Sequence, residues 1–267
     1  MNRLIGLLAS TFVALHAAAQ QAPTTSLGSV TVSGVAQPVE KSYRRMLQGM
    51  DLFERLRAEY APNAQLRYKL LPRKRGTNMD DAQLEVVGNT FSHAVPIAPD
   101  RTFTLQRDAR ALAEDAVVSP NRRRLTMTWR TEIRTPGLPP NTRRLGDLRL
   151  ECLVGMEAGL VSNTNPLMEK LSELLSSPVR YCGHKNAEYL FFAERPIFAV
   201  TLVSGTRREV LPIDRMYANA SDDPGLAREL PFCDCEVLLD RTYFLPLGDT
   251  SWPHDTLVVF DFMEDAP

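Results

Sequence analysis

Four cysteines are the residues whose type and spacing most clearly suggest chemistry: Cys152, Cys182, Cys233 and Cys235. An even number of cysteines indicates disulfides when a chain is exported. Cys233 and Cys235 are two residues apart, so on a strand their side chains point to the same face, and a bond between them would be strained. We therefore expect Cys152 and Cys182 each to pair with one of the other two, in an order that the sequence leaves open.

The same region of the chain offers an alternative, which is a metal site. Cys182, His184, Cys233 and Cys235 would supply three sulfurs and one imidazole, a set that suits zinc or a soft metal such as Cu(I). Their spacing is not that of standard zinc modules. We therefore expect two disulfides in place of a metal, and no cofactor, with one disulfide and two free thiols as a further alternative.

Five arginines near the ends of two expected strands are candidates for binding an anion. They are Arg122, Arg123, Arg124, Arg143 and Arg144. Residues 20–150 carry 21 basic against 13 acidic side chains, whereas residues 151–267 carry 9 against 19. This asymmetry is compatible with an anionic partner for the basic half, and solvated arginines are the alternative. Nucleic acid is not expected as a partner for an exported chain with a near-neutral isoelectric point.

Familiar catalytic patterns are missing from the sequence. It has no P-loop, no dinucleotide-binding glycine loop, no His-Glu-x-x-His, no EF-hand loop and no Gly-x-Ser-x-Gly. Past residue 19 only His93, His184 and His254 are present as histidine general bases. Ser251, His254 and Asp255 are close in sequence, but neighbours in a turn seldom face one another, so we expect no catalytic triad.

The first residues are typical of a cleavable signal peptide. Arg3 precedes an apolar run from Leu4 to Leu15, and small residues follow at Ala17 and Ala19. The run is too short to span a bilayer as a helix. We expect cleavage after Ala19, a loose leader over residues 20–28, no transmembrane segment in the mature chain, and a periplasmic or secreted location.

Hydrophobic periodicity predicts a mostly β (α+β) fold with two or three amphipathic helices. Helical spacing of apolar residues predicts a helix over 42–60, capped by Ser42, and another over 166–176. A short helix is expected over 108–115. Strands are expected over 66–71, 84–87, 94–97, 102–105, 124–134, 145–154, 189–192, 198–203, 209–213, 236–239, 242–245 and 256–262.

Residues 124–134 and 145–154 have the clearest alternation of apolar and polar side chains. In the second segment Arg149 and Glu151 fall on one face and apolar residues on the other. We interpret the two segments as neighbouring antiparallel strands. Glu132 and Glu151 would then pair with arginines across the ladder.

The elements group into two lobes, residues 29–160 with the inserted helix 42–60, and residues 161–267 with the helix 166–176. A pattern recurs between residues 87–105 and 204–245: a Gly-Thr turn, a strand ending in Pro-Ile, then Asp-Arg-Thr and an aromatic residue. We treat this as a possible internal repeat.

This order, Gly-x-Thr, a strand, then Asp-x-x-Phe-x-Leu, resembles the carboxypeptidase regulatory-like (transthyretin-type) β-sandwich module over about twenty residues per lobe. In that family the Asp usually precedes a Gly, and here Arg101 and Arg241 stand near that place. The resemblance implies antiparallel β-sandwich-like lobes and a non-catalytic module for folding support or binding. It carries over no catalytic residue.

These observations lead us to expect an exported, non-enzymatic binding or scaffolding protein of the cell envelope. Two alternatives remain open. One is a secreted hydrolase with an unrecognised site, and the other is a metal-binding periplasmic protein that uses Cys182, His184, Cys233 and Cys235. An envelope protein, a glycan or another anionic surface stays open as the partner.

Overall fold

The computed structural model describes residues 39–73, 76–123, 126–160, 177–185, 187, 189–217 and 238–263. It is an α+β fold with more strand than helix, which confirms the predicted fold class. The expected signal peptide and leader, the helix predicted over 166–176, and Arg124, Cys233 and Cys235 lie outside the described residues.

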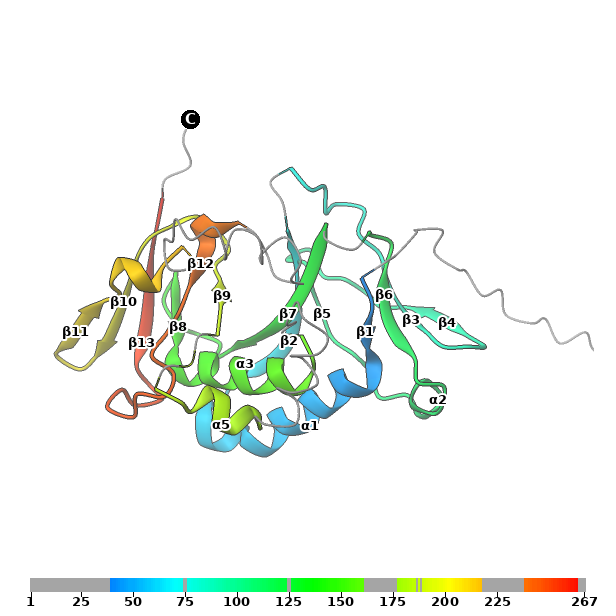
Figure 1. Ribbon diagram of the computed structural model, residues 1–267, viewed down its shortest axis with the longest axis horizontal. Coiled ribbons are helices and arrows are strands. Elements are labelled where there is room, and N and C mark those ends of the chain that lie inside the picture. Colours follow the sequence, from blue (N-terminus) through cyan, green and yellow to red (C-terminus); the bar gives the residue numbers. More distant parts are fainter. Residues whose placement is uncertain are drawn as a thin grey trace, which may run out of the picture.

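The strands form several sheets, and every pair of neighbouring strands in them is antiparallel. One sheet has the order β1 (Lys41–Ser42), β6 (Val117–Pro120), β3 (Leu84–Val87), β4 (Ser92–Ala94). A second has the order β5 (Thr102–Phe103), β2 (Gln65–Pro72), β7 (Met127–Arg134). A third has the order β11 (Arg207–Val210), β10 (Ile197–Ser204), β13 (Leu257–Phe262), β8 (Thr142–Arg144). A separate two-stranded sheet pairs β12 (Thr242–Tyr243) with β9 (Phe191–Phe192). The sheet containing β2 and β7 lies between the other two large sheets (Figure 1).

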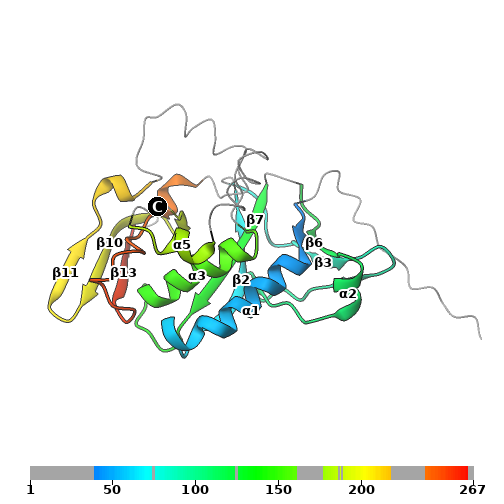
Figure 2. The same ribbon diagram turned by 60° about the horizontal axis from the view of Figure 1, so that its bottom comes forward.

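The helices are α1 (Tyr43–Tyr60), α2 (Ala109–Ala113), α3 (Leu145–Glu157) and α5 (Pro178–Cys182), with 3-10 turns at Ile213–Arg215 and Leu239–Arg241. The helix predicted over 42–60 is confirmed, because α1 covers Tyr43–Tyr60. The Ser42 hydroxyl accepts a hydrogen bond from the backbone N–H of Arg45 at 3.3 Å and so caps α1, as the sequence predicts. Helices α1 and α3 run side by side along one side of the sheets, as both views show (Figures 1 and 2).

A glycine sets how closely α1 and α3 pack. A Cβ added to Gly49 of α1 would lie 2.8 Å from the Cβ of Ala158, just beyond the end of α3. Only glycine permits this approach without a shift of one helix. The contact matters for the site described below, because α3 supports β7 from beneath.

The strand predicted over 145–154 is wrong, because these residues belong to α3. Every residue from Leu145 to Gly155 is buried, so the charged side chains that produced the alternation also lie inside the protein. Asp147, Arg149 and Glu151 each hydrogen bond to a backbone group of a neighbouring segment at 2.7–2.8 Å. The pattern therefore arose from buried, satisfied charges and not from a solvent-exposed strand face.

Two hydrophobic clusters make up the core. One gathers α3 with β10, β13 and the aromatic residues of β9 and β12, and the other gathers the start of α1 with β2, β3, β6 and β7. Leu52 and Phe53 of α1 belong to the first cluster, whereas Tyr43 and Met46 belong to the second. Helix α1 thus joins the two, and the lobe boundary at residue 160 stays a prediction. No helix in the described ranges is long and apolar enough to cross a bilayer.

Candidate functional site

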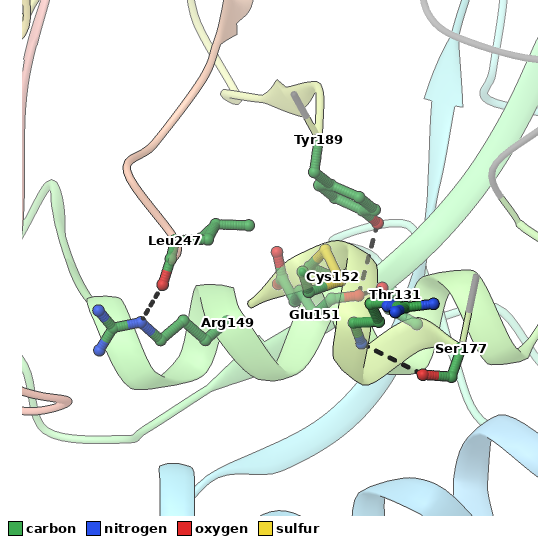
Figure 3. Close-up of a disulfide and its surroundings, with 9 residues drawn as sticks. Thr131, Arg149, Glu151, Cys152, Ser177, Tyr189 and Leu247 are labelled. Atoms are coloured by element: carbon green, nitrogen blue, oxygen red, sulfur yellow. Dashed lines mark hydrogen bonds between the residues drawn. A yellow bond between two sulfur atoms is a disulfide. The ribbon is translucent and has the colours of Figure 1, made fainter. Parts of the chain in front are cut away.

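A disulfide joins Cys152 in the middle of α3 to Cys182 at the end of α5, with a Cα–Cα distance of 6.0 Å (Figure 3). The prediction that each of them pairs with Cys233 or Cys235 is therefore wrong. The reason is local: Ser177 caps the short helix α5, which lies against α3 and carries Cys182 over Cys152. A sequence reading had no means of placing α5 there.

The disulfide also changes the candidate metal set. Cys182 is no longer available as a thiolate ligand, and two other members of the set, Cys233 and Cys235, lie outside the described residues. In the part of the chain that the structure describes, no group of three or more His, Cys, Asp or Glu side chains is arranged to hold a metal ion.

A cavity of about 320 Å³ lies over the β2–β7 ribbon and is the strongest candidate for a functional site. Its floor comes from β2 and β7, and its walls come from residues 99–101 and 189–194. The Thr131 side chain of β7 donates a hydrogen bond to the carbonyl of Glu151 in α3, so strand alternation directs its neighbours Arg130 and Glu132 to the opposite face.

We call this cavity the cationic pocket after the basic side chains that line it: Lys69, Arg101, Arg130, Arg134, Arg143 and Arg241. Four acidic side chains also line it: Asp100, Glu132, Glu151 and Glu194. The lining therefore has six cations against four anions, a net charge of +2 when all are ionised.

The floor of the cationic pocket places two cations directly opposite each other. Lys69 of β2 and Arg130 of β7 are partners in the antiparallel register, so their side chains share one face. Like charges in this position destabilise a sheet. The ammonium of Lys69 has a carboxylate of Glu194 at 3.8 Å, a distance of loose ion pairing.

Arg130 is the unusual residue of the pocket. It is only 5% exposed, and its Nε and Nη1 atoms are buried with no hydrogen-bond acceptor among the described residues. Its guanidinium lies over the ring of Phe192 at 4.5 Å and near the ring of Tyr189 at 5.9 Å. The aromatic wall thus holds the guanidinium in place without hydrogen bonding to those two nitrogens.

The acidic side chains of the pocket are paired with other arginines. Glu132 is 3.1 Å from Arg134 and 3.8 Å from Arg67, and Glu194 is 2.8 Å from Arg134. Asp100 is 3.0 Å from Arg67. None of the ion pairs formed among the described residues includes Arg130, so its charge has no carboxylate partner there.

Glu151 and Arg143 form the buried wall of the pocket. Their side chains are 2.5 Å apart, and Arg143 also donates to the carbonyl of Ile133 at 2.6 Å. Burial disfavours the charge on Arg143, but the Glu151 carboxylate outweighs this and raises the pKa of the guanidinium. The Tyr189 hydroxyl contacts the Glu151 carbonyl at 3.4 Å (Figure 3), and burial raises the pKa of this phenol although the Arg130 charge opposes the shift.

The structure does not bring together the four described arginines among the five that the sequence suggested as an anion site. Of these four, only Arg143 lines the cationic pocket. Arg122 hydrogen bonds to Asn121 and to the carboxylate of Asp81, and Arg123 is exposed outside the pocket. Arg144 immediately precedes α3 in β8, and Arg124 lies outside the described residues.

Sequence reasoning missed Arg130 although the signal was present. The alternation over 124–134 places Arg130, Glu132 and Arg134 on one face, but the sequence does not show which segment covers that face. In the structure residues 189–194 cover it, so Arg130 and Glu132 are buried.

His254 and Ser251 have separate partners. The Nδ1 atom of His254 is 3.1 Å from a guanidinium nitrogen of Arg149, and burial together with the Arg149 charge lowers the pKa of the imidazole. Ser251 accepts a hydrogen bond from Arg207 at 3.0 Å. The contact between His254 and Arg149 connects the loop before β13 to α3.

Comparisons of the chain with protein-family models, with curated proteins and with solved structures find no match. The proposals below therefore depend on the geometry of the pocket alone.

Proposed function

We propose that this chain is an exported, non-enzymatic binding protein that receives an anionic group of its ligand in the cationic pocket, at Arg130. The observation that carries the proposal is a buried guanidinium with two unsatisfied nitrogens, placed opposite a second cation in the sheet register.

Such an arrangement is costly for a protein without a ligand. A buried charge that lacks a hydrogen-bonded counter-ion lowers stability by several kcal/mol. A ligand carboxylate or phosphate would supply the missing acceptor and negative charge at the buried guanidinium. A cavity with apolar walls and a few converging polar groups is typical of small-molecule sites.

Export is supported by two independent features. The first nineteen residues have the composition of a cleavable signal peptide. The Cys152–Cys182 disulfide is compatible with an oxidising compartment such as the periplasm or the extracellular space. The intact mass of the protein recovered from that compartment should show the loss of residues 1–19, and a full-length mass would contradict export.

Isothermal titration calorimetry of the mature protein tests the anion site with a matched pair of probes. We expect 3-phenylpropanoate to bind and its neutral amide, 3-phenylpropanamide, to bind at least tenfold more weakly. Arg130→Met should weaken binding of the carboxylate roughly 10- to 100-fold, because one charge-assisted hydrogen bond contributes about 1.5–3 kcal/mol.

Arg207→Met is the control variant. Arg207 also lies over an aromatic ring, that of Trp252, but it is exposed on β11 and does not line the pocket. This variant should bind 3-phenylpropanoate as the wild type does. Equal affinity for the carboxylate and the amide, or an Arg130→Met variant with unchanged affinity, would contradict the proposal.

A further inference from the structure

Glu132 provides an unsatisfied acceptor in the cationic pocket, whereas the unsatisfied atoms of Arg130, Arg143 and Arg241 there are donors. Its side chain is 8% exposed. Its Oε1 atom accepts from Arg134 at 3.1 Å, whereas its Oε2 atom is buried with no hydrogen-bond donor among the described residues. Among the ion pairs of the described residues, the cation nearest to Oε2 is Arg67, at 3.8 Å, which is too long for a hydrogen bond.

Arg130 and Glu132 lie on the same face of β7, since they are two positions apart along the strand. Their Cα atoms are therefore roughly 6.5–7 Å apart, a spacing that two long side chains can close onto one small molecule. The pocket thus presents unsatisfied donors from Arg130 beside an unsatisfied acceptor from Glu132.

A simple anion would satisfy only one half of this pair. It would accept from Arg130 but would leave Oε2 of Glu132 without a donor, and its negative charge would stand close to a buried carboxylate. A ligand that carries a carboxylate and an ammonium on adjacent atoms would satisfy both groups, and both contacts would be charge-assisted hydrogen bonds.

The remaining lining indicates what else the ligand carries. Leu71, Pro99, Tyr189 and Phe192 line the same cavity, so its walls offer apolar and aromatic surface next to the charged floor. The volume of about 320 Å³ is at the small end of the range for ligand sites.

We infer that the ligand is a free amino acid with an apolar or aromatic side chain. Its carboxylate contacts Arg130, its ammonium contacts Oε2 of Glu132, and its side chain packs on the wall formed by Tyr189 and Phe192. This inference rests on the proposed anion-binding function and names the class of ligand for that same pocket.

Calorimetry with two matched probe pairs tests the inference. L-Phenylalanine is compared with 3-phenylpropanoate, and L-leucine with 4-methylpentanoate, because each second member lacks only the ammonium. We expect at least one amino acid to bind roughly 10- to 100-fold more tightly than its deaminated partner, the gain from one charge-assisted hydrogen bond. Phenethylamine, which lacks the carboxylate, should bind more weakly than L-phenylalanine by a similar factor.

Glu132→Gln identifies the residue responsible. The variant should lose most of the preference for the amino acid over its deaminated partner, while its affinity for 3-phenylpropanoate should stay the same or increase. Glu209→Gln is the matched control. Like Glu132, Glu209 pairs with an arginine two positions away on the same strand, since it is 3.3 Å from Arg207. Glu209 lies on β11, however, and does not line the pocket. This control should keep the wild-type preference.

The outcomes separate the two proposals. If 3-phenylpropanoate binds through Arg130 but neither amino acid binds more tightly than its partner, the amino-acid inference is overturned and the anion site remains. If none of the probes binds the wild-type protein, the proposed function itself is overturned. The wild-type comparison decides the ligand class even where Glu132→Gln fails to fold.

Discussion

Arg130→Met should make the protein more stable in the absence of ligand, which is the opposite of what loss of a buried side chain usually does. Two buried nitrogens of Arg130 lack acceptors, and each buried unsatisfied group costs about 1–3 kcal/mol. The stacking of the guanidinium over Phe192, at 4.5 Å, offsets about 0.5–2 kcal/mol of that cost. Methionine keeps the apolar stem and removes the repulsion from Lys69, so we expect the free energy of unfolding to increase by about 1–3 kcal/mol.

Arg143→Met provides the contrast, because it makes the same substitution in the same pocket. The guanidinium of Arg143 is 2.5 Å from the Glu151 carboxylate and also donates to the carbonyl of Ile133. Its removal leaves a buried carboxylate without its counter-ion, which costs about 3–5 kcal/mol. The two variants should therefore change stability in opposite directions.

Urea denaturation followed by tryptophan fluorescence measures both changes, with the disulfide intact and without added ligand. The dependence of unfolding free energy on urea should keep its slope, so that midpoints report stability. Destabilisation of the Arg130→Met protein by more than about 1 kcal/mol would show that the fold already compensates this charge. In that case the reasoning that assigns Arg130 to a ligand would fail.

Three further predictions concern the frame around the pocket. Non-reducing peptide mapping should recover the Cys152–Cys182 bond, and replacing both cysteines by alanine should lower the free energy of unfolding by about 3–4 kcal/mol, since the bond closes a loop of 30 residues. The pKa of the His254 imidazole is lowered in the folded protein, so the folded protein binds a proton at this side chain more weakly than the unfolded chain does. Stability should therefore fall as the pH drops below the ordinary imidazole pKa of 6.5. Urea midpoints between pH 7 and 5 should show this loss of stability, and His254→Gln should make the loss smaller. Gly49→Ala should lower the thermal midpoint, because the added Cβ would lie 2.8 Å from the Cβ of Ala158 and overpacking costs about 1–3 kcal/mol. Gln48 is exposed on the same helix, so Gln48→Ala should leave the midpoint unchanged.

Local sequence signals were sufficient for helix α1 and strand β7. Helix α1 has one apolar face and a side-chain cap at Ser42, and strand β7 alternates apolar and polar residues with period two, so both were predicted close to their observed bounds. Helix α3 has neither property, because its apolar and charged residues are all buried. Its alternating pattern was therefore typical of a strand, and only the backbone partners of its charges explain why it is a helix.

The cationic pocket could be predicted only in part for a related reason. The charged face of β7 is visible in the sequence, since Arg130, Glu132 and Arg134 alternate with apolar residues. What covers that face comes from residues 189–194, about sixty positions further along the chain, and no local pattern links the two segments. The pairing of Cys152 with Cys182 was missed for the same reason, because it depends on where α5 lies against α3.

The buried charges of α3 and of β7 differ in their hydrogen bonding, and this difference is what points to a function. Asp147, Arg149 and Glu151 on α3 are satisfied by backbone groups or by a counter-ion, so each stabilises a neighbouring segment of the fold. Arg130 and Glu132 have buried atoms without a hydrogen-bond partner among the described residues, and both line a cavity. A bound molecule that accepts from Arg130 and donates to Glu132 would complete the hydrogen bonding of both side chains.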